Sequence, residues 1–385
     1  MKGFKKRKIL KITLLVLLLL FLLAVGIVTS YVISKLSLID YDDGTLKETA
    51  GDYIEDVDIP DDGPGVDISG LEEVETFPVI PDTEIQKDKD IINILVLGTD
   101  PYDGTLTKYA RSDCMILVSI NKTDNTVKLV SLERGMGVYM ETGELAGEYD
   151  LLTHAFRWGG AKLVCDCVEN HLRVEVDHYV RVTFNTVRTV VDSIGGIDVE
   201  LTEKEAAAMS NMFYGIKPGM NHFNGEQALQ FSRLRSIDSD WYRVERQRKV
   251  ILAAVDAMKD CNLKELNNLL DETLPLIQTD MNMLEIADLM LYAPNFLKSE
   301  FDQRTIPEKG TYGYKDGIRG FAVDYEVNSQ ILREFLYGPE EEETTAPKLC
   351  AKEGQRCAVL LFMGAGGICL YFHFRKEMKI MVLRL

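Results

Sequence analysis

Cationic side chains gather in one short stretch of this chain, from His222 to Val250, which reads HFNGEQALQFSRLRSIDSDWYRVERQRKV. It contains five arginines and a neighbouring glutamine: Arg233, Arg235, Arg243, Arg246, Arg248 and Gln247. A guanidinium group is planar, stays charged at any working pH and offers paired donors that match phosphate oxygens. On a chain with a formal net charge of −18, this concentration of cations predicts an anion-binding site.

The first two arginines follow a short predicted helix. Asn224 and Gln227, three residues apart, match a capping box, so we expect the helix to begin near Gly225. Its inward residues would be Ala228, Leu229 and Phe231. Arg233 and Arg235 then lie where this helix ends.

A second predicted helix begins near Asp240. One stripe at helical spacing comprises Arg243, Gln247, Val250, Ala254 and Met258. Because the stripe is polar in its first turns and apolar beyond them, its inward face should start in a polar pocket and end in the core. We expect Arg246 to join Arg243 at the rim, and Arg248 to point elsewhere. The alternative is a solvated helix face with surface ion pairs to Glu245 and Asp240; the clustering favours a phosphate site.

Composition sets limits on the function. The chain has 385 residues, which suits one large or two small domains. Its 61 acidic side chains against 43 basic ones argue against a broad nucleic-acid surface, so we expect no nucleic-acid partner. The five histidines have no metal-ligand spacing, and the seven cysteines show neither a zinc pattern nor a disulfide framework.

The N-terminus has the pattern of a membrane anchor. Residues 1–11 are rich in lysine and precede an uncharged apolar run, residues 12–33. About 20 such residues cross a bilayer, and basic residues ahead of them predict a cytoplasmic tail and an extracellular remainder. A cleaved signal peptide is the alternative, since Ala24 and Gly26 are small. We favour an uncleaved single-pass anchor in the cell membrane, because the run continues to Ile33 without a clear cleavage pattern.

The next segment, residues 34–90, is dominated by acidic residues, glycine, proline and threonine, with no sustained apolar period. This composition is typical of a disordered or loosely ordered extracellular stalk. Such a stalk would hold a folded domain, residues 91–338, away from the membrane.

The folded domain opens with IINILVLG, from Ile91 to Gly98, a continuous apolar run typical of a buried central strand. Two further strands, residues 114–120 and 126–132, are joined by the turn NKTDN. This turn places the start of one strand beside the end of the other. Arg134 should therefore lie close to Arg111 and Asp113.

Asp100 and Asp113 flank one loop, so the two carboxylates can meet at the same sheet edge. Magnesium favours one or two carboxylates together with phosphate oxygens, which suits a site beside the arginines. A loop or helix-cap role is the alternative for either aspartate taken alone. Farther along, strands alternate with helices, which indicates an α/β domain with helices on both sheet faces. Apolar helix faces in residues 251–297 would be plain core or walls for a lipid chain.

The C-terminal tail, residues 339–385, changes composition abruptly. Residues 357–374 are almost free of charge and are followed by Arg375, Lys376 and Lys379. Flanking cations suit a second membrane span. The alternative is an atypical C-terminus without that role.

Several motifs in order resemble the LytR-CpsA-Psr proteins of Gram-positive cell envelopes. They are NILVLGTD, RSDCMILVSI, SLERG, HAFRWGG, HYVRVTFNTVRTVVDSIGGIDVEL, NGEQALQFSRLR and DWYRVERQ. The match covers about residues 93–250 and extends to the short cytoplasmic tail and single anchor. Separate motifs in the right order are much more specific than any one of them.

The resemblance implies a three-layer α/β/α domain with a central mixed sheet, preceded by one transmembrane helix. Its members bind a polyprenyl-pyrophosphate-linked glycopolymer, with the lipid in an apolar tunnel. They use Mg²⁺ to transfer the glycopolymer phosphate to peptidoglycan, as in teichoic acid or capsule attachment. By position, Asp100 and Asp113 would hold the metal. The pyrophosphate-binding residues would be Arg111, Arg134, Arg233, Arg235, Arg243 and Gln247, with Arg134, Arg233 and Arg235 also counted as catalytic. Asp240, also counted as catalytic, would orient arginines or assist proton transfer.

Two departures from the family pattern bear on activity. The family usually has an arginine-aspartate pair where this chain has Arg134 and Gly135, and commonly has a lysine where this chain has Leu151. The leading hypothesis is a membrane-anchored, magnesium-dependent phosphotransferase of the cell wall. The alternative is a catalytically weak lipid- or wall-polymer-binding envelope regulator, and a closer variant is pyrophosphate hydrolysis without polymer transfer.

Overall fold

The structure is a computed structural model that describes residue 23 and residues 26–42, 68, 70–75, 78–100, 110–235, 237 and 240–339. It also describes the backbone of three C-terminal strands. The chain separates into two compact units, Met1–Pro339 and Glu340–Leu385. The second contains an antiparallel sheet of β14 (Leu360–Gly364), β15 (Gly367–Phe374) and β16 (Glu377–Leu383). The described residues of the suggested second span, 357–374, are thus strands rather than a helix.

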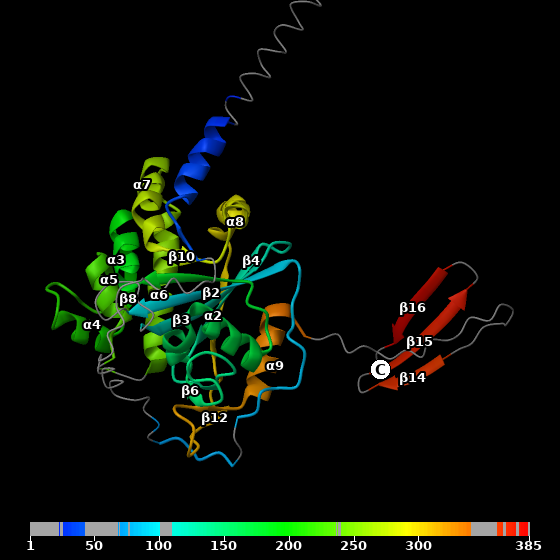
Figure 1. Ribbon diagram of the computed structural model, residues 1–385. Coiled ribbons are helices and arrows are strands. Elements are labelled where there is room, and N and C mark those ends of the chain that lie inside the picture. The colour runs from blue at the N-terminus through cyan, green and yellow to red at the C-terminus, as the bar shows by residue number, and fades with distance from the viewer. Residues whose placement is uncertain are drawn as a thin grey trace, which may run out of the picture. The chain divides into compact units, whose positions relative to one another are not determined.

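A seven-stranded mixed sheet forms the centre of the first unit (Figure 1). Its strands, in spatial order, are β1 (Asp40–Tyr41), β10 (Gln278–Thr279), β7 (His178–Thr183), β2 (Ile91–Asp100), β3 (Arg111–Asn121), β4 (Thr126–Leu132) and β11 (Phe301–Ile306). Strand β2 pairs antiparallel with β3 and parallel with β7, and β3 pairs antiparallel with β4. The predicted apolar run therefore lies at the sheet centre, as expected.

Helices flank this sheet on both faces. They are α2 (Leu152–Leu172), α3 (Phe184–Ser193), α4 (Glu203–Ser210), α5 (Gly225–Ser232), α6 (Asp240–Met258), α7 (Leu263–Thr273), α8 (Met283–Phe296) and α9 (Tyr325–Tyr337). Successive β2 residues serve opposite cores, because side chains alternate along a strand. Leu95 packs with α2 and α9, whereas Ile94 packs with α6 and α8. The α/β prediction is confirmed, with a central mixed sheet between helices.

Short elements complete the unit. They are β5 (Gly137–Tyr139), β6 (Tyr149–Leu151), β8 (Ile197–Leu201), β9 (Gly219–Phe223), the 3₁₀ turn η1 (Leu274–Leu276), β12 (Tyr312–Gly313) and β13 (Ala322–Val323). A separate core lies where α3, α5, α6 and the β8–β9 pair meet, around Val191, Val199, Phe231 and Val250. This core fixes the two helices that carry the arginine stretch.

The segment expected to be a stalk belongs in part to the folded unit. Residues 26–36 are helical, and this helix, here called the N-terminal helix, contacts α7, where the Tyr31 hydroxyl donates to Asn267 at 2.6 Å and Lys35 pairs with Asp271. Strand β1 then adds to the sheet edge, with Asp40 N donating to Ile277 O at 3.1 Å. For residues 34–42 the stalk prediction was wrong. Composition underestimated their order because backbone hydrogen bonds hold them in place.

The other end of the expected stalk also packs on the domain. Val74 N donates to Tyr314 O at 2.9 Å, and the Arg173 side chain donates from Nε to Pro81 O at 2.6 Å. The predicted domain boundary near residue 90 is therefore too late. Residues 43–67 lie outside the described residues, so the stalk prediction there is neither confirmed nor contradicted.

The predicted anchor, residues 12–33, lies mostly outside the described residues. Its described part is helical and exposes Leu23, Ile27 and Val28 by 61–62%. Among the residues that the structure describes, none of the helices combines the length and apolarity needed to cross a membrane. The anchor stays a prediction from the sequence.

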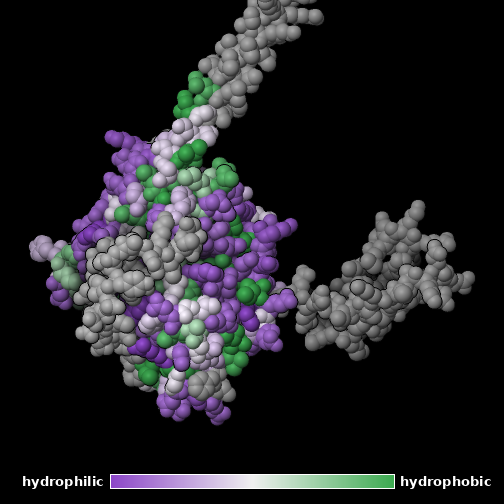
Figure 2. Space-filling view, viewed as in Figure 1, coloured by the Kyte–Doolittle hydropathy of each residue, from purple (hydrophilic) through white to green (hydrophobic). Residues whose placement is uncertain are grey.

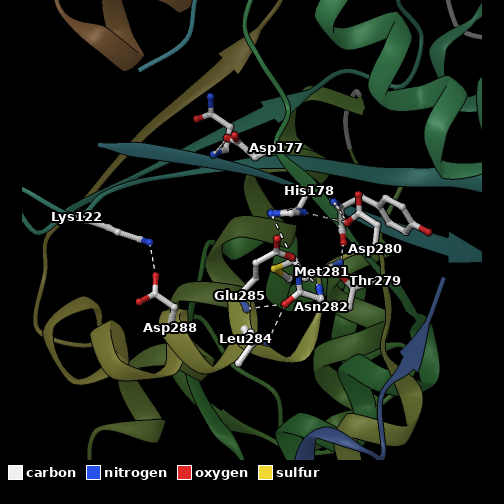
Figure 3. A network of polar contacts seen from close by, with 12 residues as sticks. Lys122, Asp177, His178, Thr279, Asp280, Met281, Asn282, Leu284, Glu285 and Asp288 are labelled. Atoms are coloured by element: carbon white, nitrogen blue, oxygen red, sulfur yellow. Dashed lines mark hydrogen bonds and ion pairs between the residues drawn. The ribbon is translucent and has the colours of Figure 1, made fainter. Parts of the chain in front are cut away.

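A polar network joins the sheet to α8 (Figure 3). His178, at the start of β7, has Nδ1 at 3.5 Å from Asp280 Oδ1 and Nε2 at 3.8 Å from Glu285 Oε2. Asp280 also accepts from Tyr179 N at 3.0 Å. Its hydrogen bond raises the pKa of His178 above the usual 6.5, against the opposing effect of burial. When it is protonated, the imidazole thus ties α8 to the sheet.

This network predicts a pH-dependent stability. Because the folded-state pKa of His178 is raised, its stabilisation is fully present below pH 6.5 and is lost as the pH rises through the folded-state pKa. His178→Gln should therefore flatten the fall in melting temperature between about pH 6 and about pH 8. His222→Gln is the comparison variant: a hydrogen bond to Asp198 also raises the pKa of His222, but the two side chains are 63% and 68% exposed, so its effect on the slope should be smaller. Equal slopes for His178→Gln and the unaltered protein would contradict the prediction.

Candidate functional site

The ends of two central strands form the base of the candidate site. Asp100 pairs with Arg111, and Thr99 pairs with Ser112, after a bulge between Gly98 and Thr99. The strands approach closely here, since a Cβ on Gly98 would lie 2.8 Å from the Cys114 Cβ. Asp100 and Asp113 therefore lie on adjacent strands, at the same end of the sheet. The structure does not describe the side chain of Asp100.

Asp113 is the carboxylate around which the arginines gather. Its Oδ1 lies 3.3 Å from Arg134 Nη1, and its Oδ2 lies 3.7 Å from Arg235 Nη2. Arg243 approaches the same residue from α6, with Nη2 at 3.5 Å from the backbone oxygen of Asp113. The predicted closeness of Arg134 and Asp113 is confirmed. Residues far apart in the sequence thus meet at one end of the central strands.

Three of the four side chains in this cluster are buried. Arg134 and Asp113 are each 8% exposed and Arg243 is 1% exposed, whereas the Arg235 side chain is 44% exposed. Three guanidiniums and one carboxylate give these four side chains a net charge of +2. Arg235 is the member of the cluster most open to solvent.

The other predicted site residues have different surroundings. Arg233 follows α5, is exposed, and has its guanidinium 4.5 Å from the centre of the Phe184 ring. Arg111 and Gln247 are half-buried on β3 and α6. Asp240 begins α6 as predicted, and its side chain is outside the described residues. The contacts between described residues thus bring Arg134, Arg235 and Arg243 to Asp113 and place Arg233 beside α3.

Two arginines of α6 have structural roles. Arg246 was predicted at the rim, and this was wrong: its Nη2 donates to Leu234 O at 2.6 Å and its Nη1 lies 3.7 Å from Glu205 of α4. It holds the backbone of Leu234, which lies between Arg233 and Arg235. Arg248 points elsewhere, as predicted, and bonds to Ser131 Oγ at 2.6 Å and Thr305 Oγ1 at 2.8 Å.

The start of α2 is a further support that the sequence motifs did not reveal. Thr153 donates from Oγ1 to Ser112 O at 3.0 Å and from its backbone N to Arg134 O at 3.2 Å. One threonine therefore binds the backbone of Ser112, just before Asp113, and the backbone of Arg134 itself. Its place just before His154 in the HAFRWGG motif was the available signal.

A buried aspartate holds this end of α2. Asp150 is 2% exposed and accepts from His154 Nδ1 at 3.0 Å and from Trp158 Nε1 at 2.9 Å. These hydrogen bonds lower the pKa of Asp150 despite the opposing effect of burial. Asp150 therefore stays ionised and fixes the first turns of α2.

The two departures from the family pattern are packed into the fold. Leu151 is 5% exposed, so an apolar side chain fills the position where a lysine is common. Gly135 O accepts from Phe321 N at 2.8 Å, which places this backbone against the segment before β13. Neither position supplies a charged group to the cluster.

A bound metal ion such as Mg²⁺ would need carboxylate oxygens as ligands. In the part of the chain that the structure describes, no three His, Cys, Asp or Glu side chains converge as a ready metal site. Magnesium needs only one or two carboxylates when substrate phosphate supplies other oxygens. Asp113 supplies one such carboxylate, and the backbone of Asp100 lies on the neighbouring strand.

A family model decides the relationship of this chain. The model of the LytR_cpsA_psr family matches residues 69–335. The chain belongs to the LytR-CpsA-Psr family. The match begins well before residue 90, which agrees with the packing of residues 70–75 and 78–90 on the LytR-CpsA-Psr domain.

Two relatives within the LytR-CpsA-Psr family are transferases by name. The chain is 32% identical over 250 residues to the polyisoprenyl-teichoic acid–peptidoglycan teichoic acid transferase TagU of Enterococcus faecalis, covering 64% of this chain and 79% of that protein. It is 28% identical over 268 residues to the corresponding transferase TagV of Bacillus subtilis, covering 67% and 68%.

Solved structures share the fold. Protein gbs0355 from Streptococcus agalactiae has a TM-score of 0.54 at 25% identity, covering 64% of this chain and 88% of that chain. The structure titled TagT bound to LI-WTA has a TM-score of 0.52 at 25% identity, covering 68% and 96%. The LytR-CpsA-Psr domain of this chain is therefore similar to one solved with a wall teichoic acid ligand.

The cap of α5 offers a test of how the arginines are positioned. Asn224 Oδ1 accepts from Gln227 N at 2.9 Å, and Gln227 Oε1 accepts from Asn224 N at 3.0 Å. We expect Asn224→Ala to cost about 1 kcal/mol in the free energy of unfolding. Because α5 leads into Arg233 and Arg235, this variant should also weaken phosphate binding. Asn262→Ala removes the like cap of α7 and should cost similar stability without that effect. Equal loss of phosphate binding in both variants would contradict the positioning role.

Proposed function

We propose that this protein transfers a glycopolymer phosphate from a polyprenyl-pyrophosphate carrier to peptidoglycan in the cell wall. The observation that carries the proposal is the gathering of Arg134, Arg235 and Arg243 around Asp113. Relatives named as teichoic acid–peptidoglycan transferases support the substrate class. We also propose a single-pass anchor at residues 12–33, with the N-terminus cytoplasmic and the domain extracellular.

The chemistry follows from the charges of the cluster. The arginines bind the pyrophosphate oxygens, and a sugar hydroxyl of the wall attacks the phosphorus that carries the glycopolymer. A new oxygen–phosphorus bond forms, the bond to the bridging oxygen breaks, and polyprenyl phosphate leaves. Arg134 and Arg243 would stabilise the charge that develops on the leaving phosphate, because buried donors held beside Asp113 need little rearrangement.

Five further residues have proposed roles. Arg233 and Arg235 lie on either side of Leu234, and Arg246 holds that backbone in position. Exposed as they are, these two arginines would capture the incoming pyrophosphate together with Arg111 and Gln247. Asp240, at the start of α6, would orient arginines or assist removal of the hydroxyl proton.

We propose Mg²⁺ as the cofactor, held by Asp100 and Asp113. When bound, it would neutralise charge on the phosphate oxygens. Asp113 also holds Arg134 and Arg235, so its carboxylate would organise the site with or without the ion.

The proposal is tested with the purified full chain, a polyprenyl-pyrophosphate glycan, peptidoglycan and Mg²⁺. Glycan linked to peptidoglycan through phosphate, with release of polyprenyl phosphate, is the expected product. Free glycan phosphate without linkage would show hydrolysis instead. Tight carrier binding with no turnover would overturn the transferase proposal and favour a binding protein.

A further inference from the structure

Helix α8 has an apolar face that the described residues leave uncovered. Not one of its residues is buried, although its sequence MLEIADLMLYAPNF is largely apolar. Leu284 is 81% exposed and Leu291 is 79% exposed, and Met283 and Met290 are exposed by 37% and 39%. These four residues recur at helical spacing and form one stripe, here called the α8 stripe. A continuous exposed apolar stripe marks an interaction surface.

The opposite face of α8 fixes the direction of this stripe. Ile286, Leu289 and Phe296 pack toward the sheet core. Glu285 lies 3.8 Å from His178 Nε2, and Asp288 pairs with Lys122 at 2.5 Å (Figure 3). Apolar packing and ion pairs therefore hold one face inward, so the α8 stripe faces away from the domain.

The chain that leaves the N-terminal helix contacts the chain that enters α8. Strand β10 ends at Thr279, shortly before α8, and pairs with β1, which follows the N-terminal helix. Asp42 N donates to Thr279 O at 2.8 Å, which joins the two segments. Figure 1 shows the N-terminal helix, α7 and α8 at the same end of the domain.

The N-terminal helix, at this end of the domain, also exposes apolar side chains. Ile27 and Val28 are exposed by 62% and 61%, and Ile33 is exposed by 53%. Figure 2 shows hydrophobic residues along this helix and beside its base. Tyr31 and Lys35 fix the helix to α7, so its direction relative to α8 is set by the fold.

We propose that the α8 stripe lies in the surface of the phospholipid bilayer that holds the anchor. This inference rests on the anchoring proposed above and adds a second membrane contact, made by the domain itself. An apolar helix face buried in the headgroup and acyl boundary is a stable arrangement for such a stripe. Contact at both the anchor and α8 sets the orientation of the domain, and the carrier pyrophosphate would be met at the membrane surface.

Photocrosslinking in the full chain tests this contact. The photoreactive residue p-benzoylphenylalanine replaces Leu284 or Leu291, and the protein is placed in nanodiscs of phosphatidylglycerol and phosphatidylcholine. The matched control carries it at Tyr214, which is 105% exposed on the segment between α4 and β9. We expect phospholipid adducts, measured by mass, at least tenfold more abundant at both leucine positions than at Tyr214.

Other results would overturn the proposal. Equal adduct yields at all three positions would show that α8 has no special contact with lipid. Crosslinks between two copies of the chain, in place of lipid adducts, would show that a second protein molecule covers the stripe. Because these nanodiscs contain no polyprenyl carrier, the adducts report the bilayer alone.

The same experiment separates this proposal from the proposed function. A chain that does not stay with the nanodiscs would overturn the anchor, whatever α8 contacts. A chain that gives the expected adducts but no transfer would overturn the transferase proposal and leave the membrane contact standing. The double variant Leu284→Gln, Leu291→Gln should raise KM several-fold for a long-chain carrier in membranes and leave a short water-soluble carrier unaffected. Unchanged KM for both carriers would contradict a role in presenting the carrier.

Discussion

Arg235→Ala is expected to lower the rate of transfer by about 10²- to 10³-fold, the usual effect of removing one donor from a site that stabilises developing charge. Arg235 lies 3.7 Å from Asp113 and its side chain is 44% exposed, so it can contact an incoming phosphate. The same exposure means that its removal should change the free energy of unfolding by less than about 1 kcal/mol. The measurement is single-turnover transfer with the full chain, paired with urea unfolding.

Arg188→Ala is a closely matched control for this variant. The Arg188 side chain is also 44% exposed and also pairs with a carboxylate, Glu226 at 3.2 Å, but it lies on α3. We expect transfer by this variant to remain within about twofold of the unaltered protein, because exposed ion pairs contribute little. Normal transfer by Arg235→Ala would contradict the role assigned to Arg235.

Asp113→Asn should have the largest effect on stability among the site variants. The Asp113 side chain is 10% exposed and is the carboxylate near both Arg134 and Arg235. Removing one partner of a buried ion pair leaves uncompensated charge, which costs about 3 kcal/mol. Transfer should fall as well, since Arg134 and Arg235 lose the group that positions them. Urea unfolding and the transfer assay measure the two effects.

Inorganic phosphate distinguishes an electrostatic effect from general damage in Asp113→Asn. Without the carboxylate, the net charge of the cluster rises by one, so phosphate should raise the melting temperature of this variant more than that of the unaltered protein. The control is Asp198→Asn, which removes the partner of His222 from a pair whose side chains are 63% and 68% exposed. A variant with unchanged stability and no added response to phosphate would refute the arrangement described for Asp113.

Local chemistry in the sequence was sufficient to predict several parts of the site. The capping box at Asn224 and Gln227 placed the start of α5, and the helix buries the three predicted residues. The apolar run from Ile91 and the turn after Asn121 placed β2, β3 and β4, and with them the closeness of Arg134 to Asp113. These features depend on neighbours within a few residues or on one hairpin, so spacing alone carries them.

The directions of the α6 arginines could not be predicted in the same way. Helical spacing puts Arg243 and Arg246 almost on one face, yet one reaches Asp113 and the other reaches Leu234 and Glu205. A long arginine side chain goes where acceptors lie, and those acceptors come from α4 and from the end of α5. Only the packing of these elements against α6 decides which cation faces the ligand.

The sequence by itself determined the family, the α/β order of elements and the concentration of cations, because each of these is written in local patterns. Tertiary structure alone decided that Asp113 gathers arginines from three parts of the chain. It also decided that Asp40 and Tyr41, within the expected stalk, join the sheet edge and that α8 presents an apolar stripe outward. Edge pairing and exposure depend on which distant segments meet, and neither composition nor periodicity records that.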